Sequence, residues 1–130
     1  MNIWKFIRSF GHGTRGLWYA VGHEQNMRVH FLAAVVAAAA GCYFGISAGE
    51  WLAIAVCIGS VIAFECVNTA VERLADRITS EVDPAIKQAK DTAAAAVLVA
   101  ALTSIVVAGV VFLPKIVALM GFTFLGQSAA

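Results

Sequence analysis

Three apolar segments dominate this chain and decide what it can fold into. They cover Val29 to Ile46, Trp51 to Phe64, and Thr92 to Leu113. The first and third approach the roughly 20 residues that a helix needs to cross about 30 Å of hydrocarbon. The whole chain is 61% hydrophobic and only 13% charged, which excludes an ordinary soluble domain. The sequence therefore predicts an all-α integral membrane protein with three transmembrane helices.

The middle segment reaches a comparable length only when the polar residues after it are included. It leads directly into E-C-V-N-T-A-V-E-R-L-A-D at 65–76, so we expect one helix over 51–78 that begins in the membrane and ends in the cytoplasm. The predicted chain is a single membrane domain. Its spans lie at 29–46, 51–78 and 92–113, with a cytoplasmic loop at 79–91 and a C-terminal tail at 114–130.

The first 27 residues mix aromatic, aliphatic and basic side chains. Trp4, Phe10 and Trp18 alternate with Lys5 and Arg8, a mixture suited to a helix that lies among the lipid headgroups with its cations toward anionic lipid. We therefore predict an N-terminal interfacial amphipathic helix over 1–27. The alternative is a loose tail in which the glycines at 11, 13 and 16 break any helix. The segment lacks the long apolar core of a cleavable signal peptide.

Basic residues gather in the segments that precede the first span and separate the second from the third. They are Lys5, Arg8, Arg15, Arg28, Arg73, Arg77, Lys87 and Lys90. The 46–50 turn has no lysine or arginine, and only Lys115 follows the third span. The positive-inside rule places the N-terminus and the 79–91 loop in the cytoplasm and the C-terminus outside. We see no basic patch suited to a nucleic-acid partner.

Four polar residues form a stripe along the second predicted helix. At about 100° of rotation per residue, Glu65, Asn68, Glu72 and Asp76 fall on one face. Ionisable side chains at hydrocarbon depth are costly, so an acid there indicates a functional site. Three helices cannot easily enclose such a row of acids, and we therefore expect a homo-oligomer.

Other motifs in the chain do not indicate a recognisable site. The G-H-G-T-R-G run at 11–16 satisfies G-x-G-x-x-G, but no strand precedes it and it opens no strand-helix-strand unit. Cys42, Cys57 and Cys66 are scattered singly, and we interpret them as packing residues. The three histidines form no ligand set and are interpreted as interfacial polar residues. Any bound metal should therefore use carboxylates.

The stripe and the segment after it resemble the small bacterial diacylglycerol kinase family. The resemblance is carried by E-x-x-N-T-A-V-E at 65–72 with Asp76, by A-K-D at 89–91, and by R-G-L at 15–17 with Glu24. It covers about residues 5–115. Within the family, E-x-N-x-R-x-H at 24–30 and F-L-P-K at 112–115 are more similar to the undecaprenol kinase branch.

This resemblance implies a homotrimer in the bacterial cytoplasmic membrane, with active sites that are shared between subunits and face the cytoplasm. It implies Mg²⁺ as cofactor and ATP as co-substrate. Glu65 would be the general base that takes the proton from the lipid hydroxyl, and Glu24 and Glu72 would hold the magnesium ion. The implied nucleotide-binding residues are Lys5, His12, Glu24, Asn68, Glu72, Asp76, Glu81, Asp83, Lys90 and Asp91. The implied lipid-binding residues are Arg15, Arg28 and Glu65.

Two functions from different classes are compatible with these features. The leading hypothesis is an ATP-dependent kinase that phosphorylates the hydroxyl of a membrane lipid alcohol, with undecaprenol ahead of diacylglycerol. The alternative is a small oligomeric proton- or ion-coupled transporter in which Glu65 is the carrier carboxylate. Magnesium-dependent nucleotide binding would favour the kinase, whereas proton-linked flux without ATP would favour the transporter.

Overall fold

The protein is built from long helices. The computed structural model describes residues 2–78 and 83–127, with side chains up to residue 121. Its helices are α1 (Ile3–His23), α2 (Gln25–Phe44), α3 (Ala48–Ile78) and α4 (Pro84–Gln127). No strand occurs in the two described ranges. The all-α prediction is confirmed.

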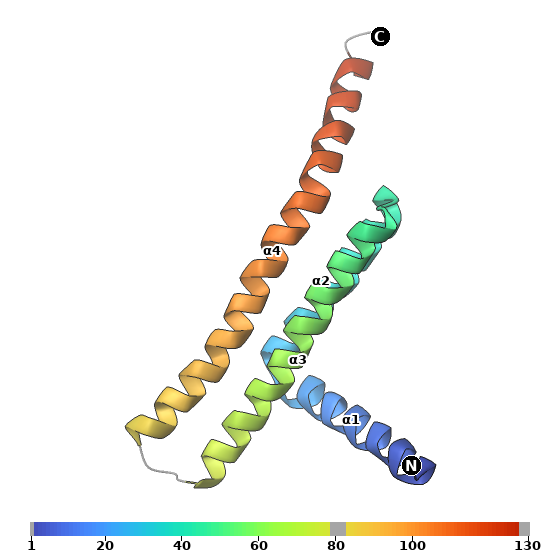
Figure 1. Cartoon of the computed structure of the whole chain (residues 1–130). Helices are drawn as coiled ribbons and strands as arrows, with labels where there is room; N and C mark the ends of the chain where they lie inside the picture. The colour runs from blue at the N-terminus through green and yellow to red at the C-terminus, as the bar shows by residue number, and fades with distance from the viewer. Residues whose placement is uncertain (1, 79–82, 128–130) are drawn as a thin grey trace.

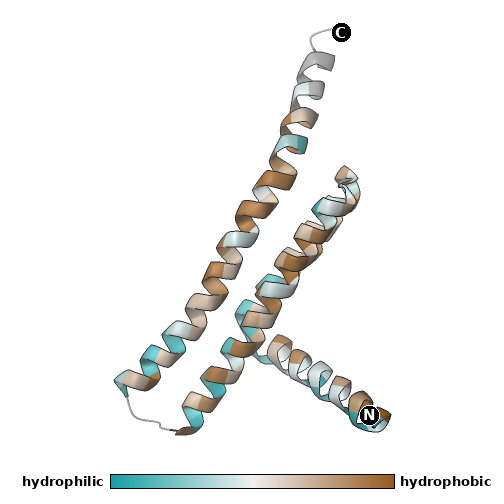
Figure 2. Ribbon diagram, in the orientation of Figure 1, coloured by the Kyte–Doolittle hydropathy of each residue, from teal (hydrophilic) through white to brown (hydrophobic). Residues whose placement is uncertain are grey.

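Three of the helices are long and apolar enough to cross a membrane. The candidate spans are Gln25–Phe44, Ala48–Ile78 and Pro84–Gly121, and a helix of 20 residues already measures about 30 Å. α4 packs most extensively on α3, and the two helices run side by side (Figure 1). Apolar residues cover most of their length, while hydrophilic residues gather where α3 ends and α4 begins (Figure 2). The prediction of three helices able to span a membrane is confirmed.

α1 diverges from the bundle (Figure 1). It contacts α2 and α3, and within the described residues it makes no contact with α4. Its first turn is capped by the side chain of Asn2, which accepts a hydrogen bond from the amide of Trp4 at 3.2 Å. The helix runs unbroken through the glycines at 11, 13 and 16, so the alternative of a tail broken there is wrong. Its position at the membrane surface stays a prediction.

The turn between α2 and α3 is specified by two local signals. Gly45 ends α2 in the left-handed region at φ 60°, ψ 49°, a conformation that glycine adopts without steric cost. Ser47 and Glu50 then form a reciprocal capping box. The Ser47 amide donates to Glu50 Oε2 at 2.7 Å, and the Glu50 amide donates to Ser47 Oγ at 3.3 Å.

α4 begins earlier than the sequence predicted. The loop expected over 79–91 is already helical from Pro84, because Asp83 Oδ1 accepts hydrogen bonds from the amides of Ala85 at 2.7 Å and Ile86 at 3.1 Å. An aspartate at the N-cap followed by proline at the first helical position is a favourable helix start. The polar residues assigned to that loop therefore lie on the first turns of α4.

α4 also continues beyond its predicted end. The tail expected over 114–130 is helical to Gln127, and Pro114 lies inside the helix. Proline within a membrane helix is tolerated because neighbouring groups can satisfy the freed backbone carbonyl. The helix carries Lys115 to α3, where its ammonium lies 2.9 Å from Glu50 Oε1. We call this region, with Ser47, Glu50 and Lys115, the far end of the bundle.

A small apolar core lies near the far end. Ile46, Ile54, Val111 and Phe112 are buried together there. Gly41 lets α2 and α3 approach closely, because a Cβ at that position would lie 2.7 Å from the Trp51 ring. At the far end, packing and the capped turn join α2 to α3, and the ion pair of Lys115 with Glu50 joins α4 to α3.

Candidate active site

The opposite end of the bundle gathers most of the predicted site residues. We call it the polar end and define it by Glu24, Glu65, Glu72, Asp76 and Lys90. Glu24 separates α1 from α2, the next three belong to α3, and Lys90 belongs to α4. The α1–α2 junction, α3 and α4 therefore meet at the position of the predicted polar stripe.

Glu65 is the most unusual of these side chains. It is only 2% exposed, and within the described part of the chain its Oε2 atom has no hydrogen-bond partner. A buried carboxyl oxygen without a partner costs free energy, so a structural role does not account for it. His30, Glu72 and Glu24 all lie within electrostatic range of Glu65. The predicted catalytic carboxyl therefore sits at the centre of the polar end.

The next turn of α3 continues the stripe. Asn68 and Thr69 are buried, and their Oδ1 and Oγ1 atoms likewise lack partners among the described residues. The Asn68 amide donates to Glu72 Oε1 at 3.0 Å, which orients that carboxylate. Buried polar groups are normally hydrogen-bonded, so three such atoms within five residues of one helix mark this turn as a candidate site.

The outer part of the stripe meets the start of α4. Lys90 Nζ donates to Asp76 Oδ1 at 2.9 Å, which joins the two helices across the segment between them. Lys87 pairs with Asp91 on the same helix, and Asp83 caps that helix. Glu81 lies outside the described residues. Side-chain exposure rises along the stripe, from the buried Glu65 to Asp76, whose side chain is 63% exposed.

Glu24 is held by a residue that the sequence did not single out. Arg73 Nη2 lies 3.3 Å from Glu24 Oε1, and its guanidinium also lies over the Tyr19 ring, 5.3 Å from the ring centre. The Tyr19 ring stacks on His23. This cluster ties α1 and the α1–α2 junction to α3. No sequence signal links Glu24 to a residue 49 positions away, so only the tertiary structure could show it.

The remaining predicted residues on α1 and α2 lie exposed and apart from α4. Lys5, His12, Arg15 and Arg28 are exposed. The Arg15 guanidinium bonds its own helix at the Gly11 carbonyl and approaches His12 Nδ1 at 3.3 Å. Since α1 does not contact α4 in the described chain, the predicted residues of α1 and Lys90 are not brought together within one subunit.

Glu24 and Glu72 are the carboxylates predicted to hold magnesium. Among the described residues, no group of three or more His, Cys, Asp or Glu side chains could hold a metal ion. Magnesium, however, is usually bound by one or two carboxylates together with substrate phosphates and water. Glu24 and Glu72 are oxygen donors of this kind, and Glu24 is paired with Arg73 in the structure. Their role as magnesium ligands stays a prediction.

The structure adds two residues that sequence reasoning passed over. Thr69 lies in the quoted motif but was given no role, although its position one residue after Asn68 could have suggested burial. His30 was interpreted as an interfacial polar residue. In the structure it lines one end of an apolar groove and lies within electrostatic range of Glu65. This position depends on how α2 packs on α3.

The chain is similar in sequence to known proteins. Residues 11–112 match the family model described as prokaryotic diacylglycerol kinase. The chain is 38% identical over 112 residues to an undecaprenol kinase of Bacillus subtilis, covering 86% of this chain and 91% of that protein. It is 33% identical over 126 residues to a diacylglycerol kinase of Synechocystis, covering 92% and 71%. It is 28% identical over 102 residues to a diacylglycerol kinase of Escherichia coli, covering 78% and 84%. The chain therefore belongs to the prokaryotic diacylglycerol kinase family and is a lipid kinase.

Proposed function

We propose that this protein transfers the γ-phosphoryl group of ATP to the hydroxyl of a membrane lipid alcohol, with undecaprenol as the favoured acceptor. The observation that carries the proposal is the buried Glu65 carboxyl, whose Oε2 has no partner within the described residues. A carboxylate poised in this way can accept a proton. The higher identity to the undecaprenol kinase than to the two diacylglycerol kinases supports the choice of acceptor.

In the proposed reaction, Glu65 accepts the hydroxyl proton of the lipid alcohol. The alcohol oxygen forms a bond to the γ-phosphorus as the bond from that phosphorus to the bridging β–γ oxygen breaks, and ADP leaves. The proton on Glu65 is then released to solvent. Asn68 orients Glu72, and Lys90, paired with Asp76, supplies a positive charge to the phosphates. Phosphoryl transfer depends mainly on such positioning and charge neutralisation.

Magnesium and the nucleotide would occupy the same end of the bundle. Glu24 and Glu72 would hold a magnesium ion, which would neutralise charge on the phosphates when bound. Asp76, Asp83, Lys90 and Asp91 would face the nucleotide. The positive-inside pattern supports a cytoplasmic location for this end. The transporter alternative loses its main support because the chain belongs to a family of kinases.

We also propose that the active unit is a homotrimer with shared sites. The separation of α1 from α4 in the described chain favours completion of each site by a neighbouring subunit. Mixed oligomers of Arg15→Met and Lys90→Met subunits test this idea, because α1 and α4 do not contact each other within the described part of one subunit. Recovery of activity in the mixture supports shared sites, whereas no recovery in proven mixed oligomers contradicts them.

The proposed activity is tested by transfer of radiolabelled phosphate from ATP to lipid. Purified protein with magnesium would receive undecaprenol and diacylglycerol at equal concentrations, and Glu65→Gln protein would serve as the control for contaminating kinases. We expect polyprenyl phosphate as the main labelled product. Dominant phosphatidic acid would reverse the choice of acceptor. No labelled lipid from folded wild-type protein would overturn the kinase proposal.

A further inference from the structure

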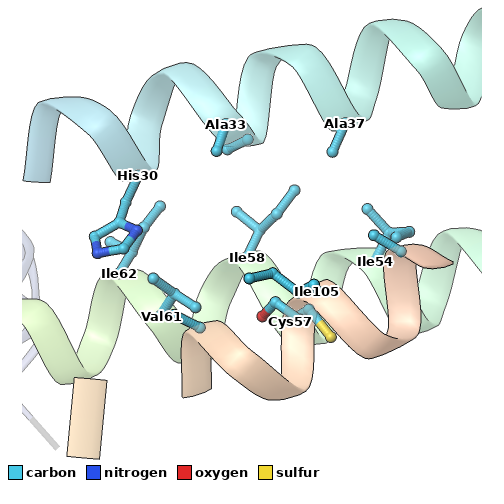
Figure 3. Close-up of a pocket in the computed structure, with 13 residues that line it drawn as sticks. His30, Ala33, Ala37, Ile54, Cys57, Ile58, Val61, Ile62 and Ile105 are labelled. Atoms are coloured by element: carbon cyan, nitrogen blue, oxygen red, sulfur yellow. The ribbon is translucent and has the colours of Figure 1, made fainter. Parts of the chain in front are cut away.

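A narrow apolar groove runs along the membrane-spanning part of the bundle (Figure 3). α2 contributes Ala33 and Ala37 to its wall, and α4 contributes Ala101 and Ala108. Ile58 and Ile62 of α3 lie between these walls. The groove has a volume of about 280 Å³, and it is neither the polar stripe nor the predicted nucleotide site.

Small side chains form much of the wall of the groove. α3 packs extensively on α4, whereas α2 and α4 touch much less. Alanines on α2 and α4 leave space beside the α3 isoleucines, and Ile105 of α4 also lines the groove. Among the described residues, this leaves an apolar surface in the membrane-spanning part of the bundle.

One end of the groove is polar. His30 of α2 lines that end, and its imidazole points toward Val61 and Ile62 of α3 (Figure 3). Glu65 follows these two residues by about one helical turn, so it lies on the same side of α3. His30 and Glu65 are also within electrostatic range of each other. The apolar groove therefore leads to the buried carboxyl whose Oε2 has no partner in the described chain.

The lining of the groove favours one kind of occupant. It spans eight or nine residues on each helix, which corresponds to about 12 Å. The lining is almost wholly apolar, and one end leads to the Glu65 carboxyl. A hydrocarbon chain with a polar end fits both the lining and the polarity.

We propose that this groove binds the apolar chain of the lipid alcohol, and that His30 is a positioning residue that holds its hydroxyl at Glu65. The proposal rests on the proposed kinase function and extends it.

Photo-cross-linking without ATP tests the groove directly. The probe is a single-chain polyprenyl alcohol with a photoactivatable diazirine within about 10 Å of its hydroxyl, in phosphatidylcholine vesicles with the full-length protein. We expect labelled peptides from the groove-lining parts of α2, α3 and α4. Ala33 is exposed yet lines the groove, so Ala33→Leu should reduce labelling at least about fivefold by filling it. Ala39 is also exposed on α2 but does not line the groove, so Ala39→Leu should leave labelling unchanged.

The outcomes separate the groove from the kinase activity. Labelling outside the groove, or equal labelling of the two leucine variants, overturns the groove while phosphate transfer by the wild type stands. Labelling in the groove without transfer from ATP overturns the proposed function and leaves the groove intact. A cross-link between the Ala33→Cys positions of neighbouring subunits that excludes the probe would show that a second copy covers the groove.

The role of His30 has its own test. Loss of one hydrogen bond to the hydroxyl predicts that His30→Ala lowers kcat/KM for the alcohol by roughly three- to tenfold, with the KM for ATP unchanged. His30→Gln, which keeps a hydrogen-bonding group, should restore part of that loss. Equal activity of the three proteins, or a change in the KM for ATP instead, would contradict the positioning role.

Discussion

Glu50 and Glu65 lie on the same helix, about four turns apart, yet they differ in their burial and in their hydrogen-bond partners. Glu50 accepts hydrogen bonds from the Ser47 amide and from Lys115. Glu65 is almost completely buried, and its Oε2 has no partner within the described residues. A satisfied acid at the far end stabilises the fold. An acid without a partner at the polar end lowers the stability of the fold, and its presence there is explained if the carboxylate interacts with a ligand.

The largest effect should come from removing the acid at the polar end. Glu65→Gln keeps the size of the side chain but cannot accept the hydroxyl proton, so phosphate transfer should fall by at least about a hundredfold. The measurement is initial-rate transfer of labelled phosphate to undecaprenol. Substantial residual activity in folded protein would remove the proton-accepting role from Glu65.

A smaller effect is expected at the outer part of the stripe. Lys90→Met removes a charge proposed to contact the phosphates, and the KM for ATP should rise by about tenfold or more. Lys87→Met is the matched control on the same helix, because its ion pair with Asp91 is more exposed than that of Lys90. Steady-state kinetics with varied ATP measure both. Equal effects of the two substitutions would contradict a specific role for Lys90.

The close approach of α2 and α3 predicts a stability effect at the far end. A Cβ at Gly41 would lie 2.7 Å from the Trp51 ring, so Gly41→Ala should lower the free energy of unfolding by about 1–3 kcal/mol. Gly59→Ala is the control, because nothing lies within 4 Å of a Cβ at that position. Thermal unfolding in detergent compares the two. A Gly41→Ala protein as stable as the wild type would show that the contact is dispensable.

The smallest effect should come from the ion pair of the far end. Lys115→Met removes the charged partner of Glu50, and we expect a loss of about 1 kcal/mol in stability, with phosphate transfer retained. The Glu50→Gln and Lys115→Met double variant should lose less than the sum of the single variants. Strict additivity in thermal unfolding would mean that the two side chains do not interact.

The sequence predicts those features that depend on local periodicity. Three apolar segments were sufficient to predict the three spans, and helical spacing was sufficient to place Glu65, Asn68, Glu72 and Asp76 on one face. The structure adds that Glu65 is buried within a single subunit. These features require no knowledge of how the helices pack.

The predictions that were wrong concern helix ends. The polar composition of 79–91 suggested a loop, although Asp83 and Pro84 are a recognisable helix start. The segment from 114 onward was expected to be a tail, although α4 continues through Pro114, as membrane helices allow.

Contacts between distant residues could not be predicted from one sequence. Arg73 with Glu24, and Lys115 with Glu50, join positions 49 and 65 residues apart. Each pairing depends on the rotation and depth at which two helices pack. The groove beside His30 has the same origin, because it arises from alanines on two helices that come together only in the fold.

The central claim is that the unpartnered acid performs chemistry while the satisfied acid maintains structure. The most direct test measures phosphate transfer and thermal unfolding for Glu65→Gln and Glu50→Gln side by side. We predict a crossed result: Glu65→Gln loses transfer with equal or higher thermal stability, and Glu50→Gln keeps transfer with lower thermal stability. Retained transfer in Glu65→Gln, or an equal loss of transfer in both variants, would contradict the claim.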